Sequence, residues 1–133
     1  MVYLFLAEGF EEIEALTPVD LLRRAGIEVT TVGIGSTTVT GSHGISVLAD
    51  MSQADATARM GEDMEMVILP GGMPGTKNLD ASTTVSAFLA VCRIKSIPVA
   101  AICAAPMILG KRGTIEVNAL KFAPCCIAFT FPL

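Results

Sequence analysis

The sequence has few charged residues and few of the side chains that usually bind metals. Charged residues make up 17% of the chain and hydrophobic residues 52%, and His43 is the single histidine. The four cysteines form no C-x-x-C pair, so a zinc site has weak support, and we expect neither a metal nor another cofactor. We expect reduced thiols, because an even cysteine count does not imply disulfides where no secretion signal is seen.

An excess of positive charge and long apolar runs are also missing. The net charge is −4 at pH 7, which argues against nucleic acid or an anionic membrane as the main partner. No run of eighteen apolar residues is present to form a membrane-spanning helix. The first residues do not resemble a signal peptide, because four glutamates occur between Glu8 and Glu14. These features predict a mature protein of the cytoplasm.

The residues that are present predict a single α/β domain over residues 1–133. A chain of this length can bury a core without disulfides, and its high apolar content favours parallel strands covered on both faces. Apolar and β-branched runs predict buried strands at residues 2–7, 27–33, 66–69 and 97–102. Two short strands, 37–40 and 45–48, should form a hairpin, and helices are expected at 11–25, 50–60 and 82–94. Pro18 should kink or break the first helix after Thr17.

Residues 97–110 are the stretch around which the rest of the chain is organised. A buried strand runs into a tight turn at Cys103, and a short helix follows with Pro106 in its first turn. A thiol at such an elbow faces backbone N–H groups and the positive end of the helix dipole, which should lower its pKa from about 8.5. The alternative is that Cys103 is an inert core cysteine. Cys92 fits the core better, because it belongs to the apolar stripe of helix 82–94.

Three other positions could contribute to the same site. Glu14 belongs to a helix start that follows the carboxyl end of a strand, although it could simply complement the helix N-terminus on the surface, like Glu11 and Glu12. The pair Gly71-Gly72 follows strand 66–69 and can aim an N–H group at an anion beside Cys103, although an ordinary loop is also possible. We expect His43 to be an exposed turn residue. A catalytic role would require another segment or a second subunit to bring it to Cys103.

Four motifs together resemble the ThiJ/PfpI superfamily, close to the branch that contains the Parkinson-associated protein. They are Glu-Glu-Ile-Glu at 11–14, Pro-Val-Asp-Leu-Leu-Arg-Arg-Ala-Gly at 18–26, Leu-Pro-Gly-Gly at 69–72 and Ala-Ala-Ile-Cys-Ala-Ala-Pro at 100–106. The resemblance covers residues 2–113. It implies a flavodoxin-like three-layer α/β sandwich related to class I glutamine amidotransferases, and usually a homodimer.

The resemblance also implies roles for individual residues. Cys103 matches the nucleophilic or redox-active cysteine, and Glu14 matches the carboxyl side chain that hydrogen-bonds to its sulfur. Gly72 and Ala104 match the backbone N–H donors of an oxyanion pocket, and Arg24 matches an arginine near the dimer contact. The activity implied is of the glyoxalase or deglycase type, on small 2-oxoaldehydes or the adducts they leave on proteins. Two alternatives stay open: an oxidative-stress sensor or chaperone that uses oxidation of Cys103, and an inactive truncated copy.

The last residues depart from the family pattern. The likeness fades over residues 114–133, which look like a frameshifted or prematurely stopped reading frame. Family members continue further and supply a histidine that no residue matches here, which makes a peptidase less favoured. Strand 97–102 would then lack a neighbour on one side unless the tail provides one. Apolar residues alternate over 126–131, so we predict a strand there.

Overall fold

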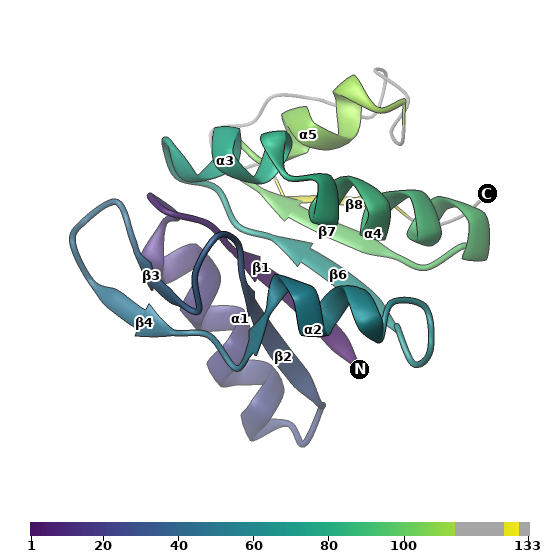
Figure 1. Cartoon of the computed structure of the whole chain (residues 1–133), viewed down its shortest axis with the longest axis horizontal. Helices are drawn as coiled ribbons and strands as arrows, with labels where there is room; N and C mark the ends of the chain where they lie inside the picture. Colours follow the sequence, from purple (N-terminus) through teal and green to yellow (C-terminus); the bar gives the residue numbers. More distant parts are fainter. Residues whose placement is uncertain (114–126, 131–133) are drawn as a thin grey trace.

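A mostly parallel sheet of six strands forms the centre of the molecule (Figure 1). The computed structural model describes residues 1–113 and 127–130. The strand order is β5 (Met51–Ser52), β2 (Val29–Gly33), β1 (Val2–Leu6), β6 (Met66–Leu69), β7 (Val99–Ile102) and β8 (Ile127–Thr130). The first five are parallel to one another, whereas β8 runs antiparallel to β7. The expected α/β fold with a mostly parallel sheet is therefore confirmed.

Helices cover both faces of this sheet, which gives the three layers that the resemblance implied. The helices are α1 (Glu12–Arg24), α2 (Gln53–Ala58), α3 (Gly75–Ala81), α4 (Thr83–Lys95) and α5 (Pro106–Lys111). In Figure 1, α1 lies behind the sheet, and α2 and α4 lie in front of it. Two separate apolar cores follow from this arrangement. One contains residues of α2, α3, α4 and α5, and the other contains residues of α1.

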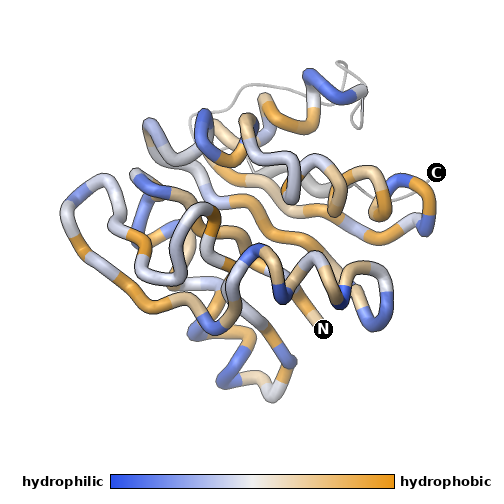
Figure 2. Tube along the Cα trace, viewed as in Figure 1, coloured by the Kyte–Doolittle hydropathy of each residue, from blue (hydrophilic) through white to orange (hydrophobic). Residues whose placement is uncertain are grey.

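Strand β1 serves both cores because successive side chains of a strand point to opposite faces. Tyr3 and Phe5 pack on the α4 side, where their rings lie 5.2 and 5.0 Å from the ring of Phe88. Leu4 and Leu6 belong to the α1 side. Every residue of β1 is buried, and hydrophobic residues follow the central strands in Figure 2. A strand covered on both faces is the near-continuous apolar run that the sequence shows at this position.

The first helix departs from expectation, because α1 runs from Glu12 to Arg24 without a break. Pro18 lies inside it, so a break after Thr17 is wrong, whereas the kink given as the alternative stays a prediction. Proline removes one helical hydrogen bond and its ring crowds the preceding turn. Ala15 and Val19 are buried against the sheet on either side of Pro18. Their burial holds the helix together across the position of the lost bond. The sequence analysis also missed α3, which occupies the segment before the predicted helix 82–94.

Two elements at the edges of the fold were predicted and are confirmed. Strands β3 (Thr38–Thr40) and β4 (Ser46–Leu48) form an antiparallel hairpin outside the main sheet. Strand β8 gives β7 the missing neighbour, in a register that pairs Val99 with Thr130 and Ile102 with Ile127. The other residues of the predicted strand, and the rest of the tail at 114–126 and 131–133, lie outside the described residues. No described helix is both long enough and apolar enough to span a membrane.

Candidate active site at the turn between β7 and α5

Cys103 occupies the turn between the end of β7 and the start of α5. Its φ angle is +59°, in the left-handed region that residues other than glycine rarely adopt. The Ala105 N–H donates to the Ile102 carbonyl at 3.0 Å and closes the turn. The Cys103 side chain is exposed, whereas Cys92 is buried in the core, where burial raises the pKa of its thiol to about 11. The core interpretation is therefore wrong for Cys103 and confirmed for Cys92.

Glu14 and Cys103 come together across the loop that follows β6. Glu14 lies in the first turn of α1, and its Oε2 accepts a hydrogen bond of 2.9 Å from the Gly71 N–H. A Cβ atom on Gly71 would lie 2.5 Å from Glu14 Oε2 and 2.9 Å from Cys103 Cβ. These three residues come from three different elements, and the absent side chain of Gly71 lets the other two approach. The sequence analysis named the glycine pair but gave its role to Gly72.

The pKa of Cys103 is raised, contrary to expectation. Partial burial of the thiol is the largest cause, followed by the charge of the Glu14 carboxylate and by its hydrogen bond with the thiol. The Ala104 N–H acts in the opposite direction, and the charge of Glu11 adds a smaller increase. Burial and the nearby carboxylates together outweigh the Ala104 N–H at the start of the six-residue helix α5. The Cys103 sulfur and the Glu14 carboxyl group therefore lie side by side at this elbow.

Gly72 and Ala104 lie on the two loops that meet at this site. Gly72 has a φ angle of +92°, and a Cβ atom there would lie 2.5 Å from the Glu11 backbone nitrogen. Its carbonyl accepts the Thr76 N–H at 2.8 Å in the loop that leads into α3. Within residues 1–113 and 127–130, no hydrogen bond from the Gly72 N–H is found. Their function as oxyanion donors stays a prediction.

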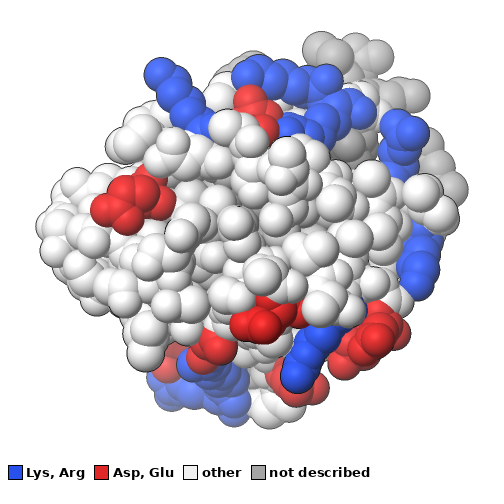
Figure 3. All heavy atoms as spheres, viewed as in Figure 1, with Lys and Arg blue, Asp and Glu red and all other residues white. Residues whose placement is uncertain are grey.

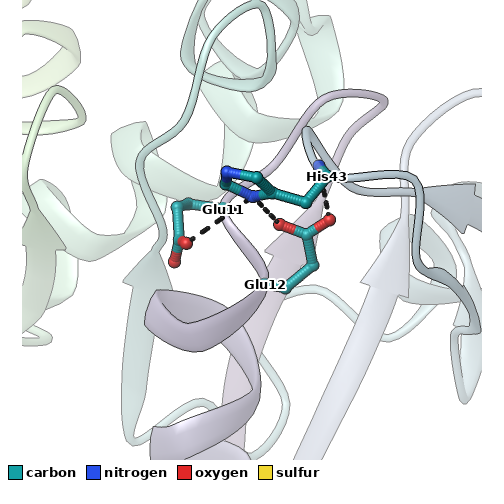
Figure 4. A group of neighbouring side chains, drawn as sticks. All are labelled: Glu11, Glu12 and His43. Carbon is teal, nitrogen blue, oxygen red and sulfur yellow. Dashed lines mark hydrogen bonds and ion pairs between the residues drawn. The ribbon is translucent and has the colours of Figure 1, made fainter.

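His43 and Glu12 form an ion pair that the sequence analysis missed (Figure 4). Glu12 is 5% exposed, and its carboxylate accepts the His43 backbone N–H at 2.7 Å and faces His43 Nδ1 at 2.8 Å. Burial opposes the charged form of Glu12, but the hydrogen bonds from His43 outweigh it and lower the pKa to about 2. The same hydrogen bond and charge raise the pKa of His43. The surface position expected for Glu12 is therefore wrong, whereas His43 is exposed as predicted.

The ligand atoms of Glu11, Glu12 and His43 lie within 4.8 Å of one another. Their proximity is accounted for by the ion pair and by the role of Glu11 as N-cap of α1. We therefore assign no metal to them. The sequence does contain one sign of this pair, namely the glycine at position 41. A side chain at that position would overlap the Glu12 carboxylate. That signal can be recognised only once the hairpin has been placed on α1.

Comparison with known proteins decides the family. The model of the DJ-1/PfpI family matches residues 1–120. The chain belongs to the DJ-1/PfpI family. It is 37% identical to protein dj-1beta of Drosophila melanogaster over 120 residues, which cover 90% of the chain and 63% of that protein. It is 40% identical to the Parkinson disease protein 7 homolog of Danio rerio over 109 residues, which cover 81% of the chain and 57% of that protein.

Solved structures of DJ-1 proteins share the fold of this DJ-1/PfpI chain. The oxidized form of Toxoplasma gondii DJ-1 matches with a TM-score of 0.79 and 34% identity, covering 84% of this chain and 60% of that one. Drosophila melanogaster DJ-1beta matches with a TM-score of 0.78 and 36% identity, covering 84% and 59%. The chain thus spans roughly 60% of the length of these relatives.

Cys103 and Glu14 lie together in this family member, whereas Arg24, which was matched to an arginine near the dimer contact, lies apart from them. Cys103, Glu14 and the loop at Gly71 meet at the carboxyl end of the parallel strands, where open α/β sheets place their sites. Arg24 lies in the last turn of α1, and its side chain is 75% exposed and pairs at 3.7 Å with Asp20. It therefore sits at the far end of the helix from Glu14.

Proposed function

We propose that this DJ-1/PfpI chain uses Cys103 to attack small 2-oxoaldehydes, or the adducts that they leave on proteins, in a reaction of the glyoxalase or deglycase type. The observation that carries the proposal is an exposed thiol on a left-handed elbow with the Glu14 carboxylate beside it. We place this activity in the cytoplasm, where thiols stay reduced.

The first step uses the carboxyl group that lies beside the thiol. The Cys103 S–H bond breaks, its proton passes to the Glu14 carboxylate, and the sulfur electron pair forms a bond to the aldehyde carbon. The carbonyl π bond opens to an oxyanion, which the N–H groups of Gly72 and Ala104 would stabilise. One such donor is typically worth about a hundredfold or more in rate. Return of the proton from Glu14 gives a neutral hemithioacetal. In this mechanism Glu14 is required for the attack, because it takes the thiol proton.

Methylglyoxal consumption tests this proposal directly. The purified chain should consume methylglyoxal, and Cys103→Ser should abolish that consumption. Cys92→Ala is the matched control, because it removes a thiol that is buried away from the site and should leave turnover intact. Equal consumption by the native chain and Cys103→Ser would overturn the proposal. A chain that aggregates on purification would instead support the alternative of an inactive copy.

A second candidate function is oxidative sensing, and the same exposed thiol supports it. The match to an oxidized form of Toxoplasma gondii DJ-1 favours this reading. Two molecules of hydrogen peroxide would convert the Cys103 thiol to a sulfinic acid and release two molecules of water. Glu14 and the Ala104 N–H would hold the added oxygens. Mild peroxide should then add two oxygens to Cys103, and Glu14→Ala should weaken that gain. A sensor that does not act on carbonyls would show the mass gain without methylglyoxal consumption.

A homodimer is the partner that we propose. Helix α1 exposes Ile13 and Leu21, which are 72% and 57% exposed and lie eight residues apart on one face of the helix. An exposed apolar helix stripe is typical of an interface. Leu21→Glu should convert a dimer to a monomer in light scattering, whereas Ile94→Glu on α4 should not. Unchanged mass in both variants would contradict the choice of α1.

We propose no role for nucleic acid or membranes. The net charge is −4, and Figure 3 shows a largely uncharged face with Lys and Arg mostly along its upper and right rim and Asp and Glu mostly along its lower rim. Binding to nucleic acid or to an anionic surface requires clustered positive charge. A retarded band with duplex DNA at physiological salt would contradict this view.

A further inference from the structure

We propose that His43 is a positioning residue of the Cys103 site: Glu12 holds its imidazole beside Glu11, where a protonated ring offsets a carboxylate that acts on the Cys103 sulfur. This inference rests on the proposed function of Cys103. It gives a role to the single histidine of the sequence, at a position that the nucleophilic attack does not itself use.

The hairpin tip is fixed on α1 by several contacts around His43. Glu12 receives both the backbone N–H and the ring Nδ1 of His43, at 2.7 and 2.8 Å. The Ser42 N–H donates to the Phe10 carbonyl at 2.8 Å, and the Ser42 hydroxyl lies 3.4 Å from Glu12 Oε2. Gly41 has no side chain to displace the Glu12 carboxylate. The imidazole is therefore held at one place although it is exposed.

Glu11 connects this pair to the thiol. Its Oε1 lies 4.0 Å from His43 Nδ1 (Figure 4), and its Oε2 accepts the Glu14 backbone N–H at 2.8 Å. The Glu11 N–H donates to the Gly71 carbonyl at 3.0 Å. Glu11 is thus hydrogen-bonded to the backbone of Glu14 and of Gly71, the two residues beside Cys103. Its charge raises the pKa of the Cys103 thiol. A cation beside Glu11 reduces that effect.

The groups that face His43 determine how the reactivity of the Cys103 thiol changes with pH. Among residues 1–113 and 127–130, the charged groups found near the ring are Glu11, the N-cap of α1, and Glu12 in its first turn, and the hairpin places the neutral Ser42 beside it. Both carboxylates favour the protonated ring, so the pKa of His43 is raised above 6.5. Below the raised value the ring offsets Glu11. As the pH rises through it, the ring loses its charge, Glu11 acts unopposed, and the thiol becomes harder to deprotonate.

The test measures how fast iodoacetamide alkylates Cys103 in the full chain as a function of pH. Peptide mass spectrometry assigns the label to Cys103. His43→Gln removes the titratable ring, and His43→Lys keeps a positive charge throughout. Below the pKa of His43, we expect His43→Gln to react roughly two- to fourfold more slowly than the native chain, because a single charge acting through a high dielectric has a small effect. His43→Lys should match the native rate there and exceed it at higher pH.

Controls separate this electrostatic role from a structural one. Arg93→Gln removes an exposed positive charge on α4 and should leave the profile unchanged. Native and His43→Gln chains with parallel profiles would overturn the proposal. Equal slowing in His43→Gln and His43→Lys would overturn it as well, because loss of the hairpin contacts alone would then explain the effect. Alkylation needs no carbonyl turnover, so a chain that fails to consume methylglyoxal still gives a decisive result here.

Discussion

Replacement of Gly71 by alanine should change two properties of Cys103 in opposite directions: its turnover of carbonyls and its alkylation by iodoacetamide. The new methyl group would lie 2.5 Å from Glu14 Oε2, 2.9 Å from Cys103 Cβ and 3.1 Å from the Ile102 carbonyl oxygen. The Glu14 carboxylate is the end of a flexible side chain, whereas the other two atoms belong to the packed elbow. We therefore expect Glu14 to move away, and its hydrogen bond from the Gly71 N–H to be lost.

The magnitude follows from two terms. A hydrogen bond to a charged group contributes about 1.5–3 kcal/mol, and overpacking costs about 1–3 kcal/mol. These terms overlap, because movement of Glu14 relieves the overpacking, so the free energy of unfolding should fall by about 2–3 kcal/mol. Displacement of a catalytic group by about 1 Å can cost a hundredfold in rate. Methylglyoxal consumption should fall on that scale.

Alkylation should change in the opposite direction. The Glu14 carboxylate is one of the groups that raise the pKa of Cys103, so its displacement lowers that pKa. Gly71→Ala should then react severalfold faster with iodoacetamide at neutral pH while it turns over carbonyls more slowly. Gly26→Ala is the matched control: it has a φ angle of +75° and nothing within 4 Å, so it should cost about 1 kcal/mol and leave Cys103 unchanged. If both variants behave alike at Cys103, the geometry described for Glu14 and Gly71 is refuted.

Three further predictions concern stability in urea. Phe88→Ala should lower the free energy of unfolding by about 3–5 kcal/mol because it empties a fully buried position, and a loss below about 1 kcal/mol would contradict this packing. Arg112→Ala should cost about 1–2 kcal/mol, because the guanidinium binds the Asp80 carboxylate at 2.6 Å. Asp80 has a lowered pKa, so that difference should shrink as the pH falls below 3.8, leaving the bonds of Arg112 to Ser86 and to backbone carbonyls. His43→Gln should be less stable than the native chain below pH 6.5 and equal to it above the raised pKa of His43. The stability that the ionised Glu12 contributes should be lost as the pH falls from 4.5 to about 2. A pH-independent effect of His43→Gln would contradict the ion pair.

Much of the fold is encoded locally and could be predicted without the structure. Strands β1, β6 and β7 are apolar runs bounded by turn residues, and they occupy nearly the residues expected. The elbow at Cys103 and the strand at 127–130 follow from equally short patterns. Pro18 shows the limit of local prediction, because the burial of Ala15 and Val19 keeps α1 continuous.

The sequence by itself determined the central strands, most of the helices, their order and the position of the cysteine on a turn. Only the tertiary structure decided what surrounds that cysteine. Partial burial raises the pKa of the thiol, and Glu14 and Glu11, which reach it from the start of a helix distant in sequence, raise it further. The burial of Glu12 beneath the hairpin was likewise invisible to local patterns. The physical reason is that electrostatic and desolvation energies depend on distances between elements, which packing sets and local sequence does not.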